Sequence, residues 1–142
     1  MAGTSNPGTQ GAREVFGAVG VAPFASGAGL DTFRSLDLQT GTLGVVKASP
    51  GMIYQVLLTN RASTIRYAKF YDAVSGTLGT GTPKYTLPIP GNSSDATTLI
   101  EHWGGLGVTF ATGICIGGST GFADNDTGAP TANDVLCTVF YK

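Results

Sequence analysis

One serine and one histidine are the residues whose surroundings best match catalytic patterns. Ser119 is the central residue of Gly-Gly-Ser-Thr-Gly at 117–121, which fits the Gly-x-Ser-x-Gly pattern of a nucleophilic serine. Such a serine lies on a strand-to-helix turn and needs an acid and then a histidine later in the chain. The sole histidine, His102, precedes the serine, and no helix is predicted after it. We therefore interpret 117–121 as a loop and predict that the protein is not an enzyme.

His102 lies between Glu101 and Trp103. A histidine and a carboxylate together can act as a general base, and an indole ring can stack on a sugar. A lone histidine is more often structural or exposed, and Trp103 fits the core or a subunit interface better than a ligand site. Because no second histidine, carboxylate pair or activated nucleophile accompanies them, we assign no catalytic, cofactor-binding or metal-binding residue.

Residues 76–81 have the glycine spacing of a phosphate-binding loop. However, Thr82-Pro83-Lys84 follows, where Lys-Ser or Lys-Thr is required. Pro83 also lacks a backbone N–H donor and blocks the helix whose N-terminus would hold the phosphate. The sequence therefore predicts no nucleotide site in this segment.

Asp124 and Asp126 begin a segment, 124–128, that matches the start of a calcium loop, because alternate carboxylates can converge on one ion. No glutamate completes the pattern, and Asp134 is the nearest later acid. Asp, Asn and Gly are also ordinary turn residues. The sequence favours a turn here and leaves a weak ion site at Asp124 and Asp126 as the alternative.

Cys115 and Cys137 each lie in an apolar run that is typical of a strand, and no Cys-x-x-Cys pattern occurs. Without that pattern, a zinc or redox site is not predicted. We interpret both cysteines as buried free thiols, since unpaired cysteine behaves as a small hydrophobic residue. A disulfide between paired strands is the alternative, and it would need an oxidising compartment.

The composition excludes several classes of protein. Of the 142 residues, 12% are charged, about half of the roughly 25% usual in soluble domains, and 42% are hydrophobic. This balance does not suit a disordered tail, and a net charge of −1 gives no excess of cations for nucleic-acid phosphates. No run of about 18 apolar residues is present to span a membrane. We therefore expect neither nucleic acid nor membrane as a partner.

The spacing of apolar residues predicts an all-β domain. Glycine recurs too often for a long helix, and no long stretch has a helical period. Alternation between turn residues predicts strands at 33–38, 43–48, 52–59, 64–71, 84–89, 97–103, 107–116 and 135–141. About eight short strands indicate an antiparallel β-sandwich that resembles a jelly roll.

Some of these segments carry more specific expectations. Segment 52–59 is largely apolar on both faces, which is typical of a central strand covered on both sides. Pro88 places 84–89 at the edge of a sheet, because proline cannot donate to a ladder. Residues 107–116 are predicted as one continuous strand, and 117–131 as a long polar loop.

The chain divides into an N-terminal arm or linker, residues 1–29, and a β-sandwich domain, residues 30–142. The arm is rich in Gly, Ala, Ser and Pro, but Val15, Phe16 and Phe24 argue against a purely solvated tail. Glycines and a proline interrupt its apolar stretch. We therefore predict no signal peptide and synthesis in a cytoplasm.

Residues 52–142 contain a series of strand and turn segments that is recognisable as a whole. Its stretches are Val-Leu-Leu-Thr-Asn at 56–60, Arg-Tyr-Ala-Lys-Phe-Tyr at 66–71, Leu-Pro-Ile-Pro at 87–90, Gly-Val-Thr-Phe-Ala-Thr-Gly-Ile at 107–114, Ala-Asp-Asn-Asp-Thr at 123–127, Ala-Asn-Asp-Val at 132–135 and Phe-Tyr-Lys at 140–142. In these stretches the chain resembles a family of small virion proteins of tailed bacteriophages. The resemblance implies a β-sandwich component of the virion and carries over no catalytic residue.

Composition and resemblance together lead to the expected function. A small domain with few charges and many strands is short of polar surface, and exposed apolar surface tends to mark an interface. Low charge also lets many copies pack side by side in a symmetric shell. We expect a capsid decoration, or cement, protein on the capsid surface, made in the host cytoplasm. Its expected partners are the major capsid protein and copies of itself, as a homotrimer.

Two other functions are left open by the sequence. A tail or fibre module that binds host glycans is suggested by Trp103, Tyr85 and the loops rich in Gly, Ser and Thr. The number of copies per particle would separate it from a capsid protein. A small hydrolase that uses Ser119 or His102 is the third hypothesis.

Overall fold

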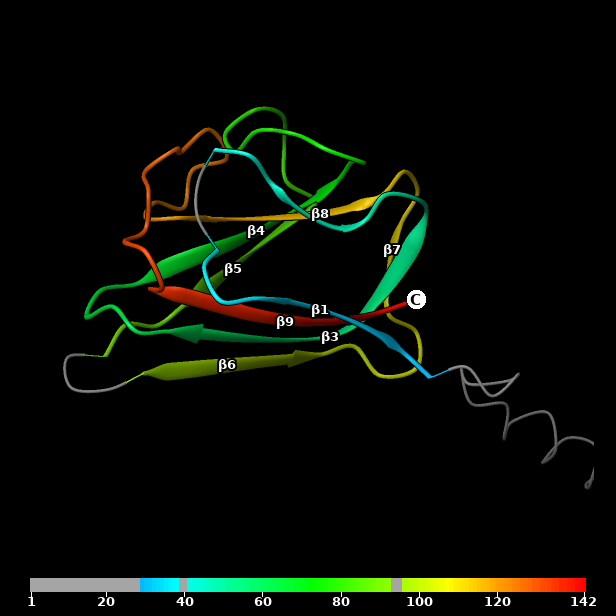
Figure 1. Ribbon diagram of the computed structural model, residues 1–142, viewed down its shortest axis with the longest axis horizontal. Helices are drawn as coiled ribbons and strands as arrows, with labels where there is room; N and C mark the ends of the chain where they lie inside the picture. The colour runs from blue at the N-terminus through cyan, green and yellow to red at the C-terminus, as the bar shows by residue number, and fades with distance from the viewer. Residues whose placement is uncertain (1–28, 39–40, 93–95) are drawn as a thin grey trace, which may run out of the picture.

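The computed structural model describes residues 29–38, 41–92 and 96–142, and these residues form nine strands. In chain order they are β1 (Asp31–Ser35), β2 (Gly44–Lys47), β3 (Gly51–Asn60), β4 (Arg66–Asp72), β5 (Tyr85–Ile89), β6 (Thr97–His102), β7 (Val108–Phe110), β8 (Ile114–Ser119) and β9 (Val135–Tyr141). They build two antiparallel sheets that lie one above the other (Figure 1). The described part of the chain is therefore an all-β sandwich, as predicted.

The strand order is that of a jelly roll. The first sheet has the order β1-β9-β3-β6, with β7 also paired to β3, and the second has the order β2-β8-β4-β5. The ladders β1–β9, β2–β8, β3–β6 and β4–β5 are all antiparallel, as in one long hairpin rolled into two layers. Strand β5 lies at an edge, which confirms the position predicted from Pro88.

The core lies between the two sheets, where alternate residues of each strand point inward. Its buried members are Leu38, Val46, Ile53, Val56, Leu58, Ala68, Phe70, Ile89, Phe110, Ile114, Ile116, Val135, Cys137 and Val139. Aromatic rings extend this core toward β5 and β6. Tyr85 stacks on Phe70 with ring centroids 4.4 Å apart and meets Trp103 edge to face at 5.5 Å. Burial raises the pKa of Tyr85, so this phenol stays neutral.

The prediction of one strand over 107–116 is wrong, because the segment crosses from one sheet to the other. β7 pairs with β3 in the first sheet, whereas β8 pairs with β2 and β4 in the second. At the corner, the Asp72 carboxylate accepts hydrogen bonds from the N–H groups of residues 111, 112 and 113, at 2.9, 2.7 and 3.3 Å. This side chain from β4 satisfies the donors that a continuous ladder would have used.

Asp72 has an electrostatic signature that matches this role. Burial alone would raise the pKa of its carboxyl group, but the three N–H donors, helped by Lys84, outweigh burial and hold the pKa below its usual value. The carboxylate therefore stays ionised and keeps the corner in place.

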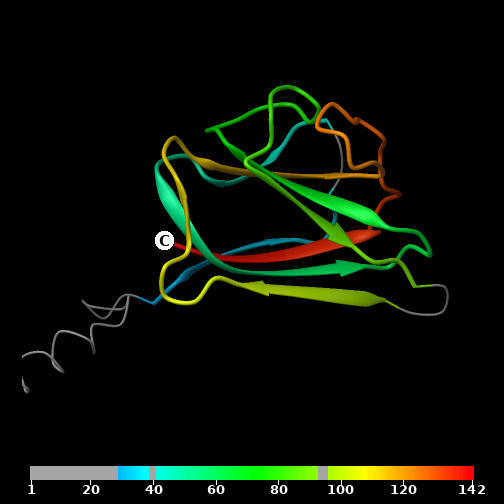
Figure 2. The same cartoon turned by 180° about the vertical axis from the view of Figure 1, so that it is seen from behind.

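The outer face of the second sheet is covered by two long connections, β4–β5 and β8–β9 (Figures 1 and 2). Under them lies a small second cluster of buried side chains, formed by Leu43, Tyr71, Leu78 and Cys115. The predicted loop 117–131 begins later than expected, since β8 continues to Ser119. Gly117 allows Leu78 of the β4–β5 connection to approach the sheet closely, since a Cβ at this position would collide with the Leu78 and Leu43 side chains.

The expectation that 52–59 is covered on both sides is only half right. β3 is indeed central, between β9 and β6. Its inward residues Ile53, Val56 and Leu58 are fully buried, but the outward Leu57 is only half-buried. No described segment lies over this outer face (Figure 1). The predicted arm, residues 1–29, lies outside the described residues apart from Gly29.

Candidate functional site

The structure separates the residues that the catalytic patterns singled out. Ser119 ends β8 in the second sheet, is fully buried, and donates a hydrogen bond from Oγ to the carbonyl oxygen of Gly121 at 2.8 Å. His102 ends β6 in the first sheet and is exposed. Glu101 alternates with it along the strand and is half-buried. The serine and the histidine therefore do not form a nucleophile and base.

The segment with phosphate-loop spacing, 76–81, lies in the β4–β5 connection. Gly79 and Gly81 there have positive φ angles of 78° and 80°, typical of turns. The chain then enters strand β5 rather than a helix. The segment thus lacks the helix N-terminus that a phosphate would need.

The aspartate-rich loop is organised around a lysine. Asp126 Oδ1 accepts hydrogen bonds from the N–H groups of Gly121 and Gly128, both at 3.0 Å, which closes the loop on itself. The fully buried Lys69 of β4 donates from Nζ to the carbonyl oxygens of Ala123, at 2.5 Å, and of Asp126, at 3.3 Å. An ammonium group thus lies against two carbonyl oxygens of the loop.

Electrostatics around Lys69 fit this arrangement. Burial lowers the pKa of the Lys69 ammonium group, while the negative charges of Asp126 and Asp124 act in the opposite direction. The negative charges of the two aspartates therefore act on an ammonium group that belongs to the protein itself. In the described part of the chain, no group of three or more His, Cys, Asp or Glu residues is placed to hold a metal ion.

Both cysteines are free and buried, as predicted, and they lie in different sheets. Cys137 belongs to the main core, and burial raises its pKa to about 11. Cys115 belongs to the smaller cluster and donates a hydrogen bond to the Ala73 carbonyl oxygen at 3.1 Å; burial raises its pKa as well. Neither thiol is poised for nucleophilic or redox chemistry.

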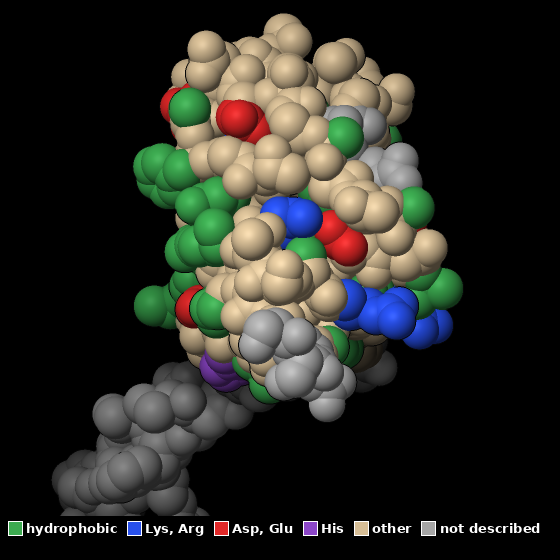
Figure 3. Space-filling view, turned by 90° about the vertical axis from the view of Figure 1, so that its left-hand side faces the viewer, with side chains coloured by type: hydrophobic (Ala, Val, Ile, Leu, Met, Phe, Trp, Pro, Cys, Tyr) green, Lys and Arg blue, Asp and Glu red, His purple; other side chains and the backbone are tan. Residues whose placement is uncertain are grey.

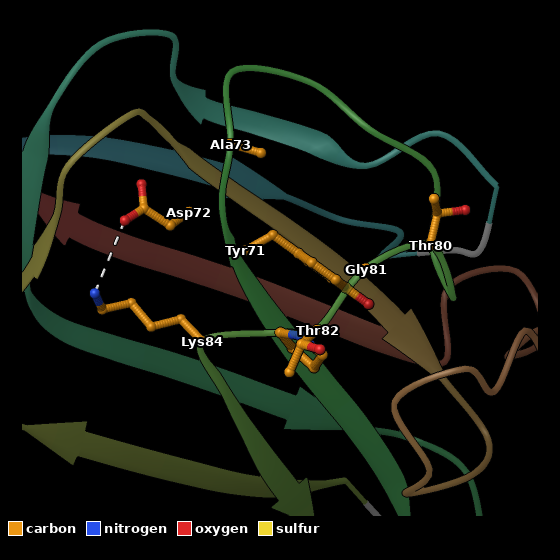
Figure 4. A pocket seen from close by; sticks show the side chains of 8 residues that line it. Tyr71, Asp72, Ala73, Thr80, Gly81, Thr82 and Lys84 are labelled. Atoms are coloured by element: carbon orange, nitrogen blue, oxygen red, sulfur yellow. Dashed lines mark ion pairs between the residues drawn. The ribbon is translucent and has the colours of Figure 1, made fainter.

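A pocket of about 450 Å³ lies beside the β4–β5 connection (Figure 4). It is lined by Tyr71, Asp72, Ala73, Thr80, Gly81, Thr82, Pro83 and Lys84. Lys84 Nζ lies 3.9 Å from Asp72 Oδ2 and 5.4 Å from the ring centroid of Phe110. Since the Asp72 carboxylate already holds the corner before β8, the pocket offers an ammonium group and hydroxyls but no free base.

The outward side of the first sheet has no structural role within the described chain. We call this surface the open face. It consists of Thr32, Arg34, Gln55, Leu57, Thr59, Thr98, Ile100, His102, Leu136, Thr138 and Phe140. The strand registers align these residues in rows across the sheet. The central row runs from Arg34 through Thr138 and Leu57 to Ile100.

The open face is mostly uncharged and partly apolar. Ile100 is 58% exposed, and Leu57, Leu136 and Phe140 are half-buried only by their neighbours in the sheet. A shallow groove of about 300 Å³ crosses it, lined by residues of β1, β3, β6 and β9. Arg34 is the one Lys or Arg on this face, and the face carries no Asp or Glu. Such a surface has the composition of a contact surface rather than that of a catalytic cleft.

A second exposed apolar group lies at the end of the molecule that carries the β3–β4 and β8–β9 connections. Hydrophobic side chains gather along one margin of this end (Figure 3). Phe122, in the β8–β9 connection, is 63% exposed and meets the Tyr67 ring edge to face, with centroids 5.8 Å apart. Sequence patterns had pointed instead to Trp103 and Tyr85, both of which pack against the core.

Comparison with known proteins found no matching family model, no similar curated protein and no similar solved structure. Among the described residues, no helix has the length and apolar character needed to cross a membrane. The candidate site therefore rests on geometry alone. Sequence analysis missed Lys69 and the open face; the clue to the latter was the outward Leu57 in a strand that is apolar on both sides.

Proposed function

We propose that this protein is a structural component of a bacteriophage virion, and that it is a capsid decoration protein rather than an enzyme. In this proposal it lies on the capsid surface, where copies of the chain contact one another and the major capsid protein. The observation that carries the proposal is the open face. It is a broad apolar and threonine-rich surface with a single Arg, and the described residues leave it without a covering layer.

The contrast between the two sheets supports an interface on the first one. Two long connections cover the second sheet and bury Lys69, Tyr71 and Cys115 beneath them. The first sheet has no comparable cover within the described chain, although its outer face carries Leu57, Ile100 and Phe140. Jelly rolls of this kind occur in viral capsid proteins and also in lectins, so the fold agrees with the proposal without selecting it.

The direct test uses phage particles from which this chain has been deleted. Particles without the chain should assemble but lose infectivity on heating or osmotic shock sooner than complete particles. Cryo-electron microscopy of complete particles should place the chain at repeated positions over the capsid. Unchanged heat resistance, or density confined to the tail, would contradict the proposal.

One observation favours a second function, a tail or fibre module that binds glycans. The exposed Phe122 ring, supported by Tyr67, has a free face on which a sugar could stack. A glycan array probed with the wild-type chain and with Phe122→Ala tests this directly. Binding that disappears in the variant would support the glycan module, and an array without hits would exclude it.

A further inference from the structure

We propose that the open face is the docking site for residues 14–24 of a neighbouring copy of this chain. This inference rests on the proposed function, because it explains how copies would be held together. Leu57 at the centre of the face gives the first reason. An outward leucine in the middle of a sheet, with Leu136 and Phe140 beside it, is expected to be covered in the working assembly.

The proposed occupant matches the face in composition. Residues 15–24 read Val-Phe-Gly-Ala-Val-Gly-Val-Ala-Pro-Phe and contain no charge. In an extended conformation, residues of even number share one side, which places Phe16 and Phe24 together with small residues between them. Two aromatic rings separated by Ala and Gly can lie flat on a sheet of threonines and aliphatic side chains.

Length and point of attachment also agree. Twenty-eight residues precede Gly29, and the chain then enters β1, the edge strand of the sheet that carries the open face. Fully extended, residues 14–24 span about 36 Å, which is more than enough to reach from Arg34 in β1 to either end or to the far edge of the open face. Residues 25–30 provide the link between the docked segment and its own domain.

Charge complementarity sets the direction of docking. Arg34 is the one Lys or Arg on the open face, and Glu14 is the only acidic residue among residues 1–28. Glu14 shares its side of an extended segment with Phe16, whereas the adjacent Arg13 points to the other side. An ion pair between Glu14 and Arg34 would therefore fix one end of the segment at β1.

Photocrosslinking of the full chain tests the docking. Benzoylphenylalanine replaces Thr138, which lies next to Arg34 and Leu57 in the central row of the open face. This chain is co-expressed with a second version that carries only Val21→Ile as a mass marker. A crosslink to the marked segment can form only between copies. Benzoylphenylalanine at Val45, which is 41% exposed on the other sheet, is the matched control.

The expected result is crosslinked peptides from residues 14–24, about half of them with the marker, and none from the Val45 control. Peptides without the marker alone would mean that each segment docks on its own copy, which overturns the exchange between copies. No crosslink to 14–24 would overturn the docking itself. If the purified chain nevertheless self-associates and still protects particles from heat, the proposed function stands and only this inference fails.

A charge exchange tests the pairing separately. Arg34→Glu and Glu14→Arg should each lower the crosslink yield by up to about fivefold, the range of a single partly exposed ion pair. The double variant Glu14→Arg/Arg34→Glu should recover most of the yield, since the opposite charges face each other again. A double variant that is as weak as the worse single variant would contradict the pairing.

Discussion

At the scale of single residues, two polar side chains determine where strands end. Asp72 binds the three N–H groups of the corner between β7 and β8. Asn60, fully buried at the end of β3, donates from Nδ2 to the carbonyl oxygens of Thr64 and Ile89 and accepts from the N–H of Ala62. Both replace backbone ladder partners with side-chain atoms, so their removal leaves backbone N–H or C=O groups without these partners.

Replacing Asp72 with Asn should destabilise the protein by about 2 kcal/mol, because an amide presents one acceptor oxygen and no charge to the three N–H groups. The effect should be largest at neutral pH. The pKa of Asp72 is lowered in the folded state, so the stability it contributes is present above about pH 4 and lost as the pH falls below that. Urea unfolding at several pH values measures this.

Lys84→Met is the control for Asp72, since it removes the 3.9 Å ion pair and the contact of the ammonium group with the Phe110 ring but leaves the three N–H bonds of the corner intact. It should cost less than about 1 kcal/mol. Equal losses for Lys84→Met and Asp72→Asn would mean that the ion pair, and not the hydrogen-bonded corner, provides the stabilisation.

Because the Cys137 thiol is buried, we expect the free energy of unfolding to fall at alkaline pH. The pKa of this thiol rises from 9.0 to about 11 on folding, so between these pH values the unfolded chain releases a proton that the folded chain keeps. The free energy of unfolding should therefore fall by about 2 kcal/mol from pH 9 to 11 through this group. Cys137→Ala, which removes the titrating thiol without adding volume to the core, should show a correspondingly flatter profile. The same slope in both proteins would rule out this origin.

At the scale of elements, the strands follow from local sequence, but their breaks and covers do not. Alternation predicts β3, β4, β5, β6 and β9 within a few residues, because each buries one face against the core. The break between β7 and β8 depends on Asp72, which is far away in the sequence. The burial of Lys69 depends on the β8–β9 connection, and no local pattern signals that its carbonyls converge there.

The loop over Lys69 leads to a prediction for that element. In Lys69→Met, the carbonyl oxygens of Ala123 and Asp126 lose their donor, and the two aspartates lose the positive charge they face. We expect a loss of about 1–3 kcal/mol and faster amide exchange across 120–128, with the first sheet unaffected. Hydrogen–deuterium exchange mass spectrometry resolves this. Lys47→Met, in β2, is the control and should leave amide exchange in the loop unchanged. Unaltered loop exchange in Lys69→Met would contradict the role of Lys69.

At the scale of the whole molecule, the two sheets face different surroundings. The second sheet is covered by its own connections, whereas the first presents the open face. The sequence indicated an interface only through low charge and an apolar excess, and it could not say which side of the sandwich carries it. That choice becomes clear only when the registers bring Arg34, Leu57 and Ile100 into one row across three different parts of the chain.

Sedimentation velocity of the full chain tests the contact role of the open face most directly. The wild-type protein should sediment as an oligomer, and Leu57→Lys should weaken self-association at least about tenfold by placing a charge at the centre of the contact. Val45→Lys, on the other sheet, should behave like the wild type. A wild-type protein that stays monomeric at high concentration, or a folded Leu57→Lys variant that associates as well as the wild type, would contradict the account.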